Sequence, residues 1–508
     1  MRLSGLIAPR DNASASTAAL ELLRGGDTEI LGVATDSRHV QPGYLFIAVP
    51  GTQKDGRAFI PNALSRGAVA VLAPAGQNND LPLPADFPLL LAHDMRSATA
   101  YVAAAFYPRQ PEIIVAVTGT SGKTSTVQFA REIWGALGQS SASLGTIGLV
   151  TAKGSHYGSL TTPDSLTLHK TLDSCVREGV TRLAMEASSH GIELKRLDCV
   201  KIKAAGFTNF SRDHLDYHTT MEAYFSAKLR LFEELLEPHG TAVLNADIPE
   251  FDALCRVADA RKVNVISYGK NAQDLKVLEI VPDSKGQVLR LSVFGRERRA
   301  LFPVMGQFQA WNALCALGLV LGGDAPGSSR DDADIIAALE RVTPVPGRLQ
   351  HIGHTPSGGS VFIDYAHKPN ALENVLVALR PHVDAKAGGR LVAVFGCGGN
   401  RDKGKRPLMG GIAQSLADMV IVTDDNPRHE DPDTIRREIL EGCHTIGAPA
   451  PVEIGDRAEA IRMAVTGLQR GDVLVIAGKG HESGQIIGDK TIPFDDALVA
   501  RGVLSTLT

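Results

Sequence analysis

The chain has 508 residues, of which 44% are hydrophobic and 21% charged, and its formal net charge is −4. This length is too great for one hydrophobic core and predicts about three domains. A net acidic chain is a poor candidate for general nucleic-acid binding. No apolar stretch of the sequence approaches the roughly 18–20 residues of a membrane span, and residues 1–10 lack the pattern of a secretory signal. The six cysteines are scattered without a CxxC pair, which argues against zinc and favours a reduced, cytoplasmic setting.

The first predicted unit, from residue 1 to about 108, is a small α/β domain. Residues 44–49 and 68–72 have the apolar, β-branched character of strands. Proline and glycine in residues 50–51 and prolines in residues 82–84 mark the loops between elements.

A phosphate-binding loop is the strongest signal in the chain. The apolar run 113–117 predicts a strand, and residues 126–131 predict a helix. Between them lies the sequence VTGTSGKTS, residues 117–125, in which Lys123 would neutralise an anion and Thr124 would offer a hydroxyl to a metal ion. Val117 stands where the standard P-loop has a glycine, so the loop is shorter. We expect this segment to bind a nucleoside triphosphate.

The second predicted domain, residues 109–342, alternates strands and helices. Residues 182–186 and 204–209 are strand-like, and each run ends in a polar residue, Glu186 and Asn209. Ligands collect beyond the carboxyl ends of parallel strands, so both side chains should face the crevice of the phosphate loop. Glu186 is a candidate Mg²⁺ ligand. The alternative is a solvent-facing glutamate beside a pair of helix-capping serines.

Two further segments of this domain carry groups that could bind metal or transfer protons. Residues 213–218 contain two aspartates and two histidines, including His214. Lys228 lies ten residues beyond them on an amphipathic helical pattern, with apolar partners at helical spacing. From its pattern alone, Lys228 is interpreted as a surface lysine.

The third predicted domain, residues 343–508, is a second doubly wound α/β unit. Residues 361–364, 390–396, 419–423 and 472–478 are strand-like, and residues 369–379 are helical. Polar loops follow three of the strands, at 396–406, 424–428 and 478–482. Their arginines and carboxylates suit a zwitterionic ligand such as an amino acid, bound in one shared pocket. The alternative is three separate solvated loops.

In their order along the chain, these motifs resemble the muramyl peptide (Mur) ligases, from about residue 30 to the C-terminus. The resemblance is carried by residues 118–125, 186–190, 213–216, 227–232, 364–367 and 425–428. It implies an α/β fold of three domains: a small N-terminal domain, a central P-loop-type doubly wound parallel sheet and a C-terminal Rossmann-like domain. It also implies a monomeric cytoplasmic enzyme of peptidoglycan precursor synthesis, without membrane insertion. The enzyme would use ATP and Mg²⁺ to form an amide bond through an acyl phosphate.

The resemblance also assigns the nucleotide and metal sites. It implies ATP binding by Gly119, Thr120, Ser121, Gly122, Lys123, Thr124, Ser125, Asn312, Arg348 and Asp364. It implies magnesium sites at Thr124, Glu186, His214 and Lys228, with Lys228 carbamylated, and catalytic roles for Lys123, Glu186, His214 and Lys228. Gln309, near Asn312, departs from the asparagine usual in the family.

The two other substrates are assigned in the same way. The resemblance implies contacts to the UDP-muramyl dipeptide from Thr35, Ser37, Thr52, Gln53, Lys54, Thr161, Thr162, Ser188 and Arg196. It implies a diaminopimelate pocket at Arg401, Asp425, Asn426, Pro427, Arg428, Gly478 and Glu482. Arg428 could pair with the distal carboxylate of diaminopimelate, and family members that add L-lysine lack an arginine there.

Three alternatives remain beside this reading. The same reaction could use L-lysine, or, more remotely, glutamate as in folylpolyglutamate synthetases. A P-loop binding or regulatory protein without ligase activity is the alternative from another class. That last reading leaves the C-terminal polar loops and the set Glu186, His214 and Lys228 without a function.

Overall fold

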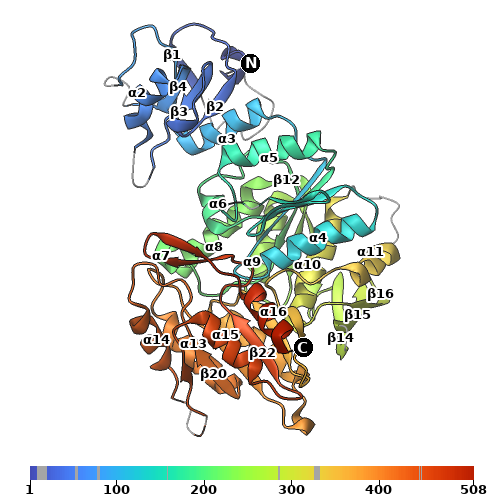
Figure 1. Ribbon diagram of the computed structural model, residues 1–508. Helices are drawn as coiled ribbons and strands as arrows, with labels where there is room; N and C mark the ends of the chain where they lie inside the picture. Colours follow the sequence, from blue (N-terminus) through green and yellow to red (C-terminus); the bar gives the residue numbers. More distant parts are fainter. Residues whose placement is uncertain are drawn as a thin grey trace.

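The computed structural model describes residues 1–7, 20–51, 55–76, 81–156, 158, 160–283, 286–324, 332–444, 447 and 449–507. Figure 1 shows three successive units, coloured blue, cyan to yellow, and orange to red along the chain. Within the described ranges, no helix is both long enough and apolar enough to cross a membrane.

The N-terminal unit is a sheet of order β1-β5-β4-β3-β2, parallel except for the edge strand β1. Its elements are α1 (Ser4–Ile7), β1 (Leu20–Arg24), β2 (Gly32–Ala34), β3 (Tyr44–Ile47), α2 (Ile60–Ser65), β4 (Ala68–Pro74), β5 (Leu89–Ala92) and α3 (Met95–Phe106). Helix α3 starts at the N-cap Asp94, whose carboxylate accepts hydrogen bonds from two backbone N–H groups of the first turn. It packs against α5 of the next unit.

The central unit is built on a sheet of order β16-β15-β14-β13-β12-β11-β6-β10-β7-β8-β9. Its first half comprises β6 (Ile113–Thr118), α4 (Lys123–Ala136), β7 (Ser141–Gly145), β8 (Gly148–Thr151), β9 (Gly154–His156), α5 (Ser165–Arg177), β10 (Arg182–Glu186), α6 (Ser189–Glu193), β11 (Ile202–Phe207), α7 (Leu215–His218) and α8 (Met221–Arg230). Its second half comprises β12 (Leu236–Asn245), α9 (Phe251–Arg261), β13 (Asn264–Gly269), β14 (Leu275–Asp283), β15 (Gly286–Val293), β16 (Arg296–Phe302), α10 (Gln307–Gly323) and α11 (Asp332–Ala338).

Helices cover both faces of the central parallel strands. One core contains apolar residues of α4 and α10, and the other contains those of α5 and α9. Strand β6 is a continuous apolar run buried on both faces, as its sequence predicts. The antiparallel strands β14 to β16 extend one edge of the sheet, and β8 and β9 extend the other.

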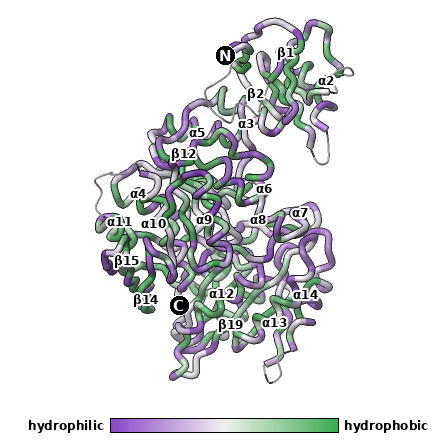
Figure 2. Tube along the Cα trace, turned by 180° about the vertical axis from the view of Figure 1, so that it is seen from behind, coloured by the Kyte–Doolittle hydropathy of each residue, from purple (hydrophilic) through white to green (hydrophobic). Residues whose placement is uncertain are grey.

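The C-terminal unit has a sheet of order β17-β18-β22-β19-β20-β21, parallel except for β17. Its elements are β17 (Gln350–His354), β18 (Ser360–Asp364), α12 (Pro369–Leu379), β19 (Leu391–Phe395), α13 (Lys405–Leu416), β20 (Met419–Val422), α14 (Pro432–Leu440), β21 (Val452–Glu453), α15 (Arg457–Thr466), β22 (Val473–Ala477), β23 (Gly484–Ile487), β24 (Lys490–Pro493) and α16 (Asp496–Leu507). Helices α12 to α14 pack on one face, and α15 and α16 on the other. Viewed from behind, hydrophobic segments such as α10 and β19 lie within their units (Figure 2).

The predicted α/β class is confirmed, and most predicted elements are present. The helix predicted at 369–379 coincides with α12, whereas the strand predicted to reach Asn209 ends at Phe207. The antiparallel extensions of the central sheet were not predicted. Residues 52–54, assigned to the sugar nucleotide, lie outside the described residues.

Candidate active site

A cavity of about 680 Å³ lies between the central and C-terminal units. The phosphate loop, residues 120–125, forms part of its wall, together with Glu186, Ser188 and Lys228. From the C-terminal unit and the helices leading to it, the cavity is lined by Asn312, Arg348, Asp364, Tyr365, His367 and Lys368. The cavity also includes Thr161 and His214. The structure thus brings predicted nucleotide, metal and substrate residues to one space.

The phosphate loop needs its glycines for steric reasons. Gly119 has a φ of +138°, and a Cβ there would lie 2.0 Å from the hydroxyl oxygen of Thr208. Gly122 has a φ of +87°, and its Cβ would lie 2.2 Å from Asn312 Oδ1. The Lys123 ammonium donates to the carbonyl of Gly119 at 2.8 Å and to that of Thr120 at 3.1 Å. Burial and then the charge of Lys368 lower the pKa of Lys123 to about 8.

Glu186 is 1% exposed, so the interpretation of a solvent-facing glutamate is wrong. Its carboxylate accepts hydrogen bonds from the backbone N–H of Thr146 at 2.8 Å and from the Thr146 hydroxyl at 3.1 Å. Two such bonds leave lone pairs free to ligate a cation. The loop around it is tied to Thr162, whose hydroxyl donates to the Glu186 carbonyl and lies 3.0 Å from Ser188 Oγ. Arg196 donates to the Thr162 carbonyl at 2.8 Å. Three residues predicted to bind the muramyl peptide, Thr162, Ser188 and Arg196, are therefore joined by hydrogen bonds.

Lys228 is 1% exposed, so the interpretation of a surface lysine is wrong. It lies on α8, and its ammonium donates to the Gly119 carbonyl at 2.9 Å. The same nitrogen lies 4.4 Å from the ring centroid of Tyr224. Among the described residues, no acidic side chain forms an ion pair with Lys228, and burial lowers the pKa of Lys228 well below the usual range. The helical spacing correctly placed Lys228 on an amphipathic helix, α8, but did not predict that its side chain lies buried against the phosphate loop.

Asp213 and His214 form a polar corner beside the cavity. The Asp213 carboxylate lies 3.1 Å from His214 Nε2 and 2.5 Å from Lys368 Nζ. Lys368 comes from the C-terminal unit, so this contact crosses the boundary between two units. His190 packs edge-on against His214, with 4.9 Å between ring centroids.

The nucleotide residues predicted beyond the loop also converge. Arg348 donates to the Thr124 hydroxyl at 3.1 Å, and its guanidinium carbon lies 4.4 Å from the Tyr365 ring centroid. Asp364 accepts from the backbone N–H of Leu349 and that of Ala366, both at 2.7 Å. Burial raises the pKa of Asp364 to about 6.

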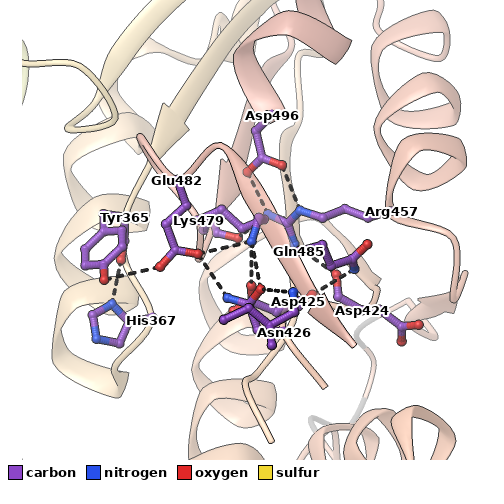
Figure 3. A network of polar contacts seen from close by, with 12 residues as sticks. Tyr365, His367, Asp424, Asp425, Asn426, Arg457, Lys479, Glu482, Gln485 and Asp496 are labelled. Carbon is purple, nitrogen blue, oxygen red and sulfur yellow. Dashed lines mark hydrogen bonds and ion pairs between the residues drawn. The ribbon is translucent and has the colours of Figure 1, made fainter. Parts of the chain in front are cut away.

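A second polar network, in the C-terminal unit, is centred on Lys479 (Figure 3). This lysine is fully buried, and its ammonium lies 3.1 Å from Asn426 Oδ1, 3.1 Å from Glu482 Oε2 and 3.5 Å from Asp425 Oδ1. The Asn426 amide donates to Glu482 at 2.9 Å. The interpretation as three separate solvated loops is therefore wrong for residues 424–428 and 478–482. Tyr365, which lines the cavity, donates to Glu482 Oε1 at 3.5 Å and so touches both sites.

Arg428 lies at the edge of this network. Its backbone has a φ of +53° and is held by the hairpin β23–β24: its N–H donates to the Ile486 carbonyl at 3.0 Å, and its carbonyl accepts from Gly488 at 2.7 Å. Its guanidinium donates to the Gly399 carbonyl at 2.9 Å. Burial and the neighbouring charge of Arg401 lower the pKa of Arg428. The guanidinium groups of Arg428 and Arg401 together would attract a carboxylate.

Several predicted residues lie away from the cavity. Thr35 and Ser37 are in the N-terminal unit, directly after β2, and Arg401 is exposed on a loop of the C-terminal unit. Sequence reasoning did not assign roles to Tyr224, Tyr365, Lys368 or Lys479, although three of them stand within or beside motifs that it quoted. The sequence could have indicated them by their position, either directly after a predicted strand or next to a motif residue.

The residues present fit a divalent cation. Thr124, Glu186 and His214 line one cavity, and the carboxylate of Glu186 has unused lone pairs. Among the described residues, no three His, Cys, Asp or Glu side chains are placed to hold a metal by themselves. Magnesium in phosphate sites needs only one or two carboxylates, because substrate oxygens and water complete its shell.

Three family domains match consecutive parts of the chain. The Mur ligase family catalytic domain matches residues 29–113, the Mur ligase middle domain residues 117–320, and the Mur ligase glutamate ligase domain residues 347–480.

Curated relatives match over almost the full length. The chain is 45% identical over 496 residues to UDP-N-acetylmuramoyl-L-alanyl-D-glutamate--2,6-diaminopimelate ligase of Agrobacterium fabrum, covering 98% of this chain and 97% of the relative. Relatives of the same name in Bradyrhizobium diazoefficiens and Caulobacter vibrioides are each 48% identical, over 92% of this chain. They are covered over 93% and 94% of their own lengths.

Solved structures of a ligase and a synthase are similar to this chain in fold. A structure of UDP-N-acetylmuramoyl-L-alanyl-D-glutamate--2,6-diaminopimelate ligase aligns with a TM-score of 0.67 at 34% identity, covering 94% of this chain and 95% of that one. Folylpolyglutamate synthase of Mycobacterium tuberculosis, complexed with ADP and AMPPCP, aligns with a TM-score of 0.63 at 20% identity, covering 81% and 94% of the two chains. The second likeness shows a shared fold alone.

Proposed function

Because this chain belongs to the Mur ligase family, we propose that it adds diaminopimelate to UDP-N-acetylmuramoyl-L-alanyl-D-glutamate at the expense of ATP. The observation that carries the proposal is the shared cavity. It joins the phosphate loop, Glu186 and Lys228 to Tyr365, which in turn contacts the amino-acid network through Glu482. A P-loop regulatory protein would need neither Lys228 buried against the loop nor that network.

In the first step, an oxygen of the D-glutamyl carboxylate attacks the γ-phosphorus of ATP, and the bond from that phosphorus to ADP breaks. We propose that Lys123 leaves its two carbonyl partners to bind the phosphoryl oxygens, where charge is stabilised in the transition state. Arg348 already contacts Thr124 and so lies beside the same phosphates. The other proposed nucleotide contacts are loop residues 119–125, Asn312 and Asp364.

Magnesium, when bound, would neutralise phosphate charge and orient the transferring group. Thr124, Glu186 and His214 would hold it. We propose that Lys228 is carbamylated on its Nζ, which would exchange an ammonium for an anion that can ligate a second magnesium ion. Support comes from geometry: the amine is buried, its hydrogen-bond acceptor is a carbonyl, and it lies beside the phosphate loop.

In the second step, the amine of diaminopimelate attacks the carbonyl carbon of the acyl phosphate, phosphate leaves, and the amine loses a proton. The proposed amino-acid site comprises Arg401, Asp425, Asn426, Pro427, Arg428, Gly478 and Glu482. Arg428 and Arg401 would bind the distal carboxylate, which L-lysine lacks. The positive charge of this pair favours diaminopimelate over L-lysine.

The muramyl dipeptide would extend from the cavity toward the N-terminal unit. Thr161 and Ser188 line the cavity, and Thr162 and Arg196 are bonded to them or to their neighbours. We assign residues 1–108 to the sugar nucleotide, 109–342 to ATP and 343–508 to the amino acid. We further propose a cytoplasmic monomer that binds no nucleic acid, and light scattering after size exclusion would test the monomer.

The test is phosphate release measured with ATP, Mg²⁺, the UDP-muramyl dipeptide and a panel of diaminopimelate, L-lysine and glutamate. We expect release to require diaminopimelate and the new amide to be found by mass spectrometry. Release that does not depend on any amino acid would refute the ligase. Equal use of L-lysine would refute only the role of Arg428.

A further inference from the structure

Lys368 reaches across the boundary between the C-terminal and central units. Its ammonium lies 2.5 Å from Asp213 Oδ2, and the two side chains are only 16% and 14% exposed. Lys368 also lines the cavity that contains the phosphate loop. It belongs to none of the residue groups assigned above.

The backbone that carries Lys368 is fixed by the C-terminal unit. Asp364 accepts from Ala366 at 2.7 Å, and Lys405 donates to the carbonyl of His367 at 2.8 Å. Lys368 itself is the N-cap residue of α12, with extended backbone and Pro369 at the start of the helix. The position of this ammonium therefore follows the position of the whole C-terminal unit.

The charges around the phosphate loop point to an anionic ligand. Lys123 and Lys228 bond to backbone carbonyls of the loop, and the charge of Lys368 acts on both of them. Like charges repel more strongly in a poorly hydrated site than in bulk water. The ammonium groups of Lys123 and Lys368, which line one cavity, are stabilised when phosphate oxygens occupy it.

We infer that Lys368 is a further phosphate-binding cation beside Lys123, which the C-terminal unit brings to the terminal phosphate of ATP while Asp213 holds its ammonium in place. This rests on the proposed use of ATP and not on the identity of the amino acid. Lys368 donates hydrogen bonds to oxygens of the phosphoryl group while the bond to ADP breaks and the bond to the carboxylate forms. It transfers no proton.

The test measures nucleotide affinity on the full-length protein with Mg²⁺, comparing ADP with a non-hydrolysable ATP analogue by calorimetry. For Lys368→Met we expect the triphosphate to bind roughly tenfold or more weakly, because a hydrogen bond to a charged group is lost, with ADP affinity changed less than about threefold. Lys368→Arg should restore part of the difference. Lys386→Met, at an exposed position of the same unit, is the matched control.

An equal loss for both nucleotides, or no loss for either, would overturn the inference. Asp213→Asn separates phosphate binding from a purely structural contact between the units. We expect Asp213→Asn to weaken binding of the ATP analogue less than Lys368→Met does. If the two variants weakened binding of ADP and of the ATP analogue equally, the contact would be structural only. Lys368→Gln repeats the comparison if the methionine variant does not fold. None of these measurements contains diaminopimelate, so they do not depend on amino-acid specificity.

Discussion

At the scale of single residues, the site depends on side chains whose surroundings contradict their usual preferences. Lys228 is buried although lysine is mostly exposed, and Arg428 has a left-handed backbone although it is not glycine. The burial of the Lys228 amine and the left-handed backbone of Arg428 each cost free energy, and the surrounding contacts offset that cost. Such residues are candidates for function, and two of the predictions concern them.

The first prediction is that Arg428→Ala raises the KM for diaminopimelate by roughly tenfold or more, because a charge-assisted pair with the distal carboxylate is lost. The KM for ATP should change little. Arg437→Ala, at an exposed position of the nearby helix α14, serves as control. Steady-state kinetics with each substrate varied in turn gives both constants, and equal changes in the two would count against the assigned pocket.

The second prediction is that Lys228→Ala loses about a hundredfold or more in kcat and that added bicarbonate does not restore it. Carbon-13 NMR of the wild type in labelled bicarbonate should show a carbamate signal that the variant lacks. Lys201→Ala, at an exposed position of the same unit, should keep both the signal and the rate. A wild-type kcat in Lys228→Ala would contradict the carbamate hypothesis.

At the scale of elements, α15, α16 and the hairpin β23–β24 support the polar network around Lys479, the proposed amino-acid site. The ion pair of Arg457 on α15 and Asp496 on α16 is fully buried, with contacts of 2.7 Å. Arg457 also donates to the carbonyl of Ala477, next to the predicted site residue Gly478, at 2.9 Å. From the hairpin, Gln485 donates to the carbonyl of Asp425 at 2.7 Å. Gln485 therefore holds the loop of residues 424–428, and Arg457 holds the start of the loop of residues 478–482.

The third prediction is that Arg457→Met lowers the free energy of unfolding of the C-terminal unit by about 3–5 kcal/mol, because Asp496 is left buried without its partner. Urea unfolding followed by circular dichroism measures the loss. Arg457→Met combined with Asp496→Leu should recover much of it, since no buried charge remains. Arg462→Met, half-exposed on the same helix, should change stability little.

The sequence predicted elements better than it predicted contacts between them. Strands such as β6 and β10 are apolar runs whose local pattern is sufficient, and α12 was predicted to the residue. The phosphate loop was also predictable, because its glycines and lysine act within a few residues of each other. The burial of Lys228 and the partner of Lys368 depend on groups 109 and 155 residues away in the chain. Hydrophobic periodicity and secondary-structure propensity carry no information about contacts between residues so far apart in the chain.

At the scale of the whole molecule, a few polar contacts cross each boundary between units. Lys195 of the central unit lies 2.6 Å from Asp94 at the start of α3. On the other side, Thr343 donates to Glu132 through its backbone and its hydroxyl, and Arg348 contacts Thr124. Boundaries of this kind permit rigid-body movement of the units, which would close the site before a hydrolysable acyl phosphate forms.

The fourth prediction concerns the contact between Asp94 and Lys195. Burial raises the pKa of Asp94, but hydrogen bonds from Lys195 and Ser97 outweigh it and lower the pKa to about 2, below the usual 3.8. The carboxylate therefore stabilises the folded state above pH 4, and this contribution is lost as the pH falls toward 2.

Lys195→Met keeps the helix cap and removes the pair, so we expect it to cost about 0.5–1 kcal/mol at pH 7, as for partly exposed ion pairs. The difference from wild type, measured by urea unfolding at several pH values, should shrink below pH 4. A difference that stays constant down to pH 3 would contradict the assignment. Lys170→Met, at an exposed position of α5, is the control.

Tyr365 has a consequence for how the site could be inhibited. Its ring lies 4.4 Å from the guanidinium carbon of Arg348, next to the proposed nucleotide site, while its hydroxyl contacts Glu482 of the proposed amino-acid site. One aromatic side chain thus contributes to both proposed binding sites. A single small molecule that stacked on this ring could extend a group toward each site. It would then compete with ATP and the amino acid at once, so a mutation that restored one substrate would not by itself confer resistance.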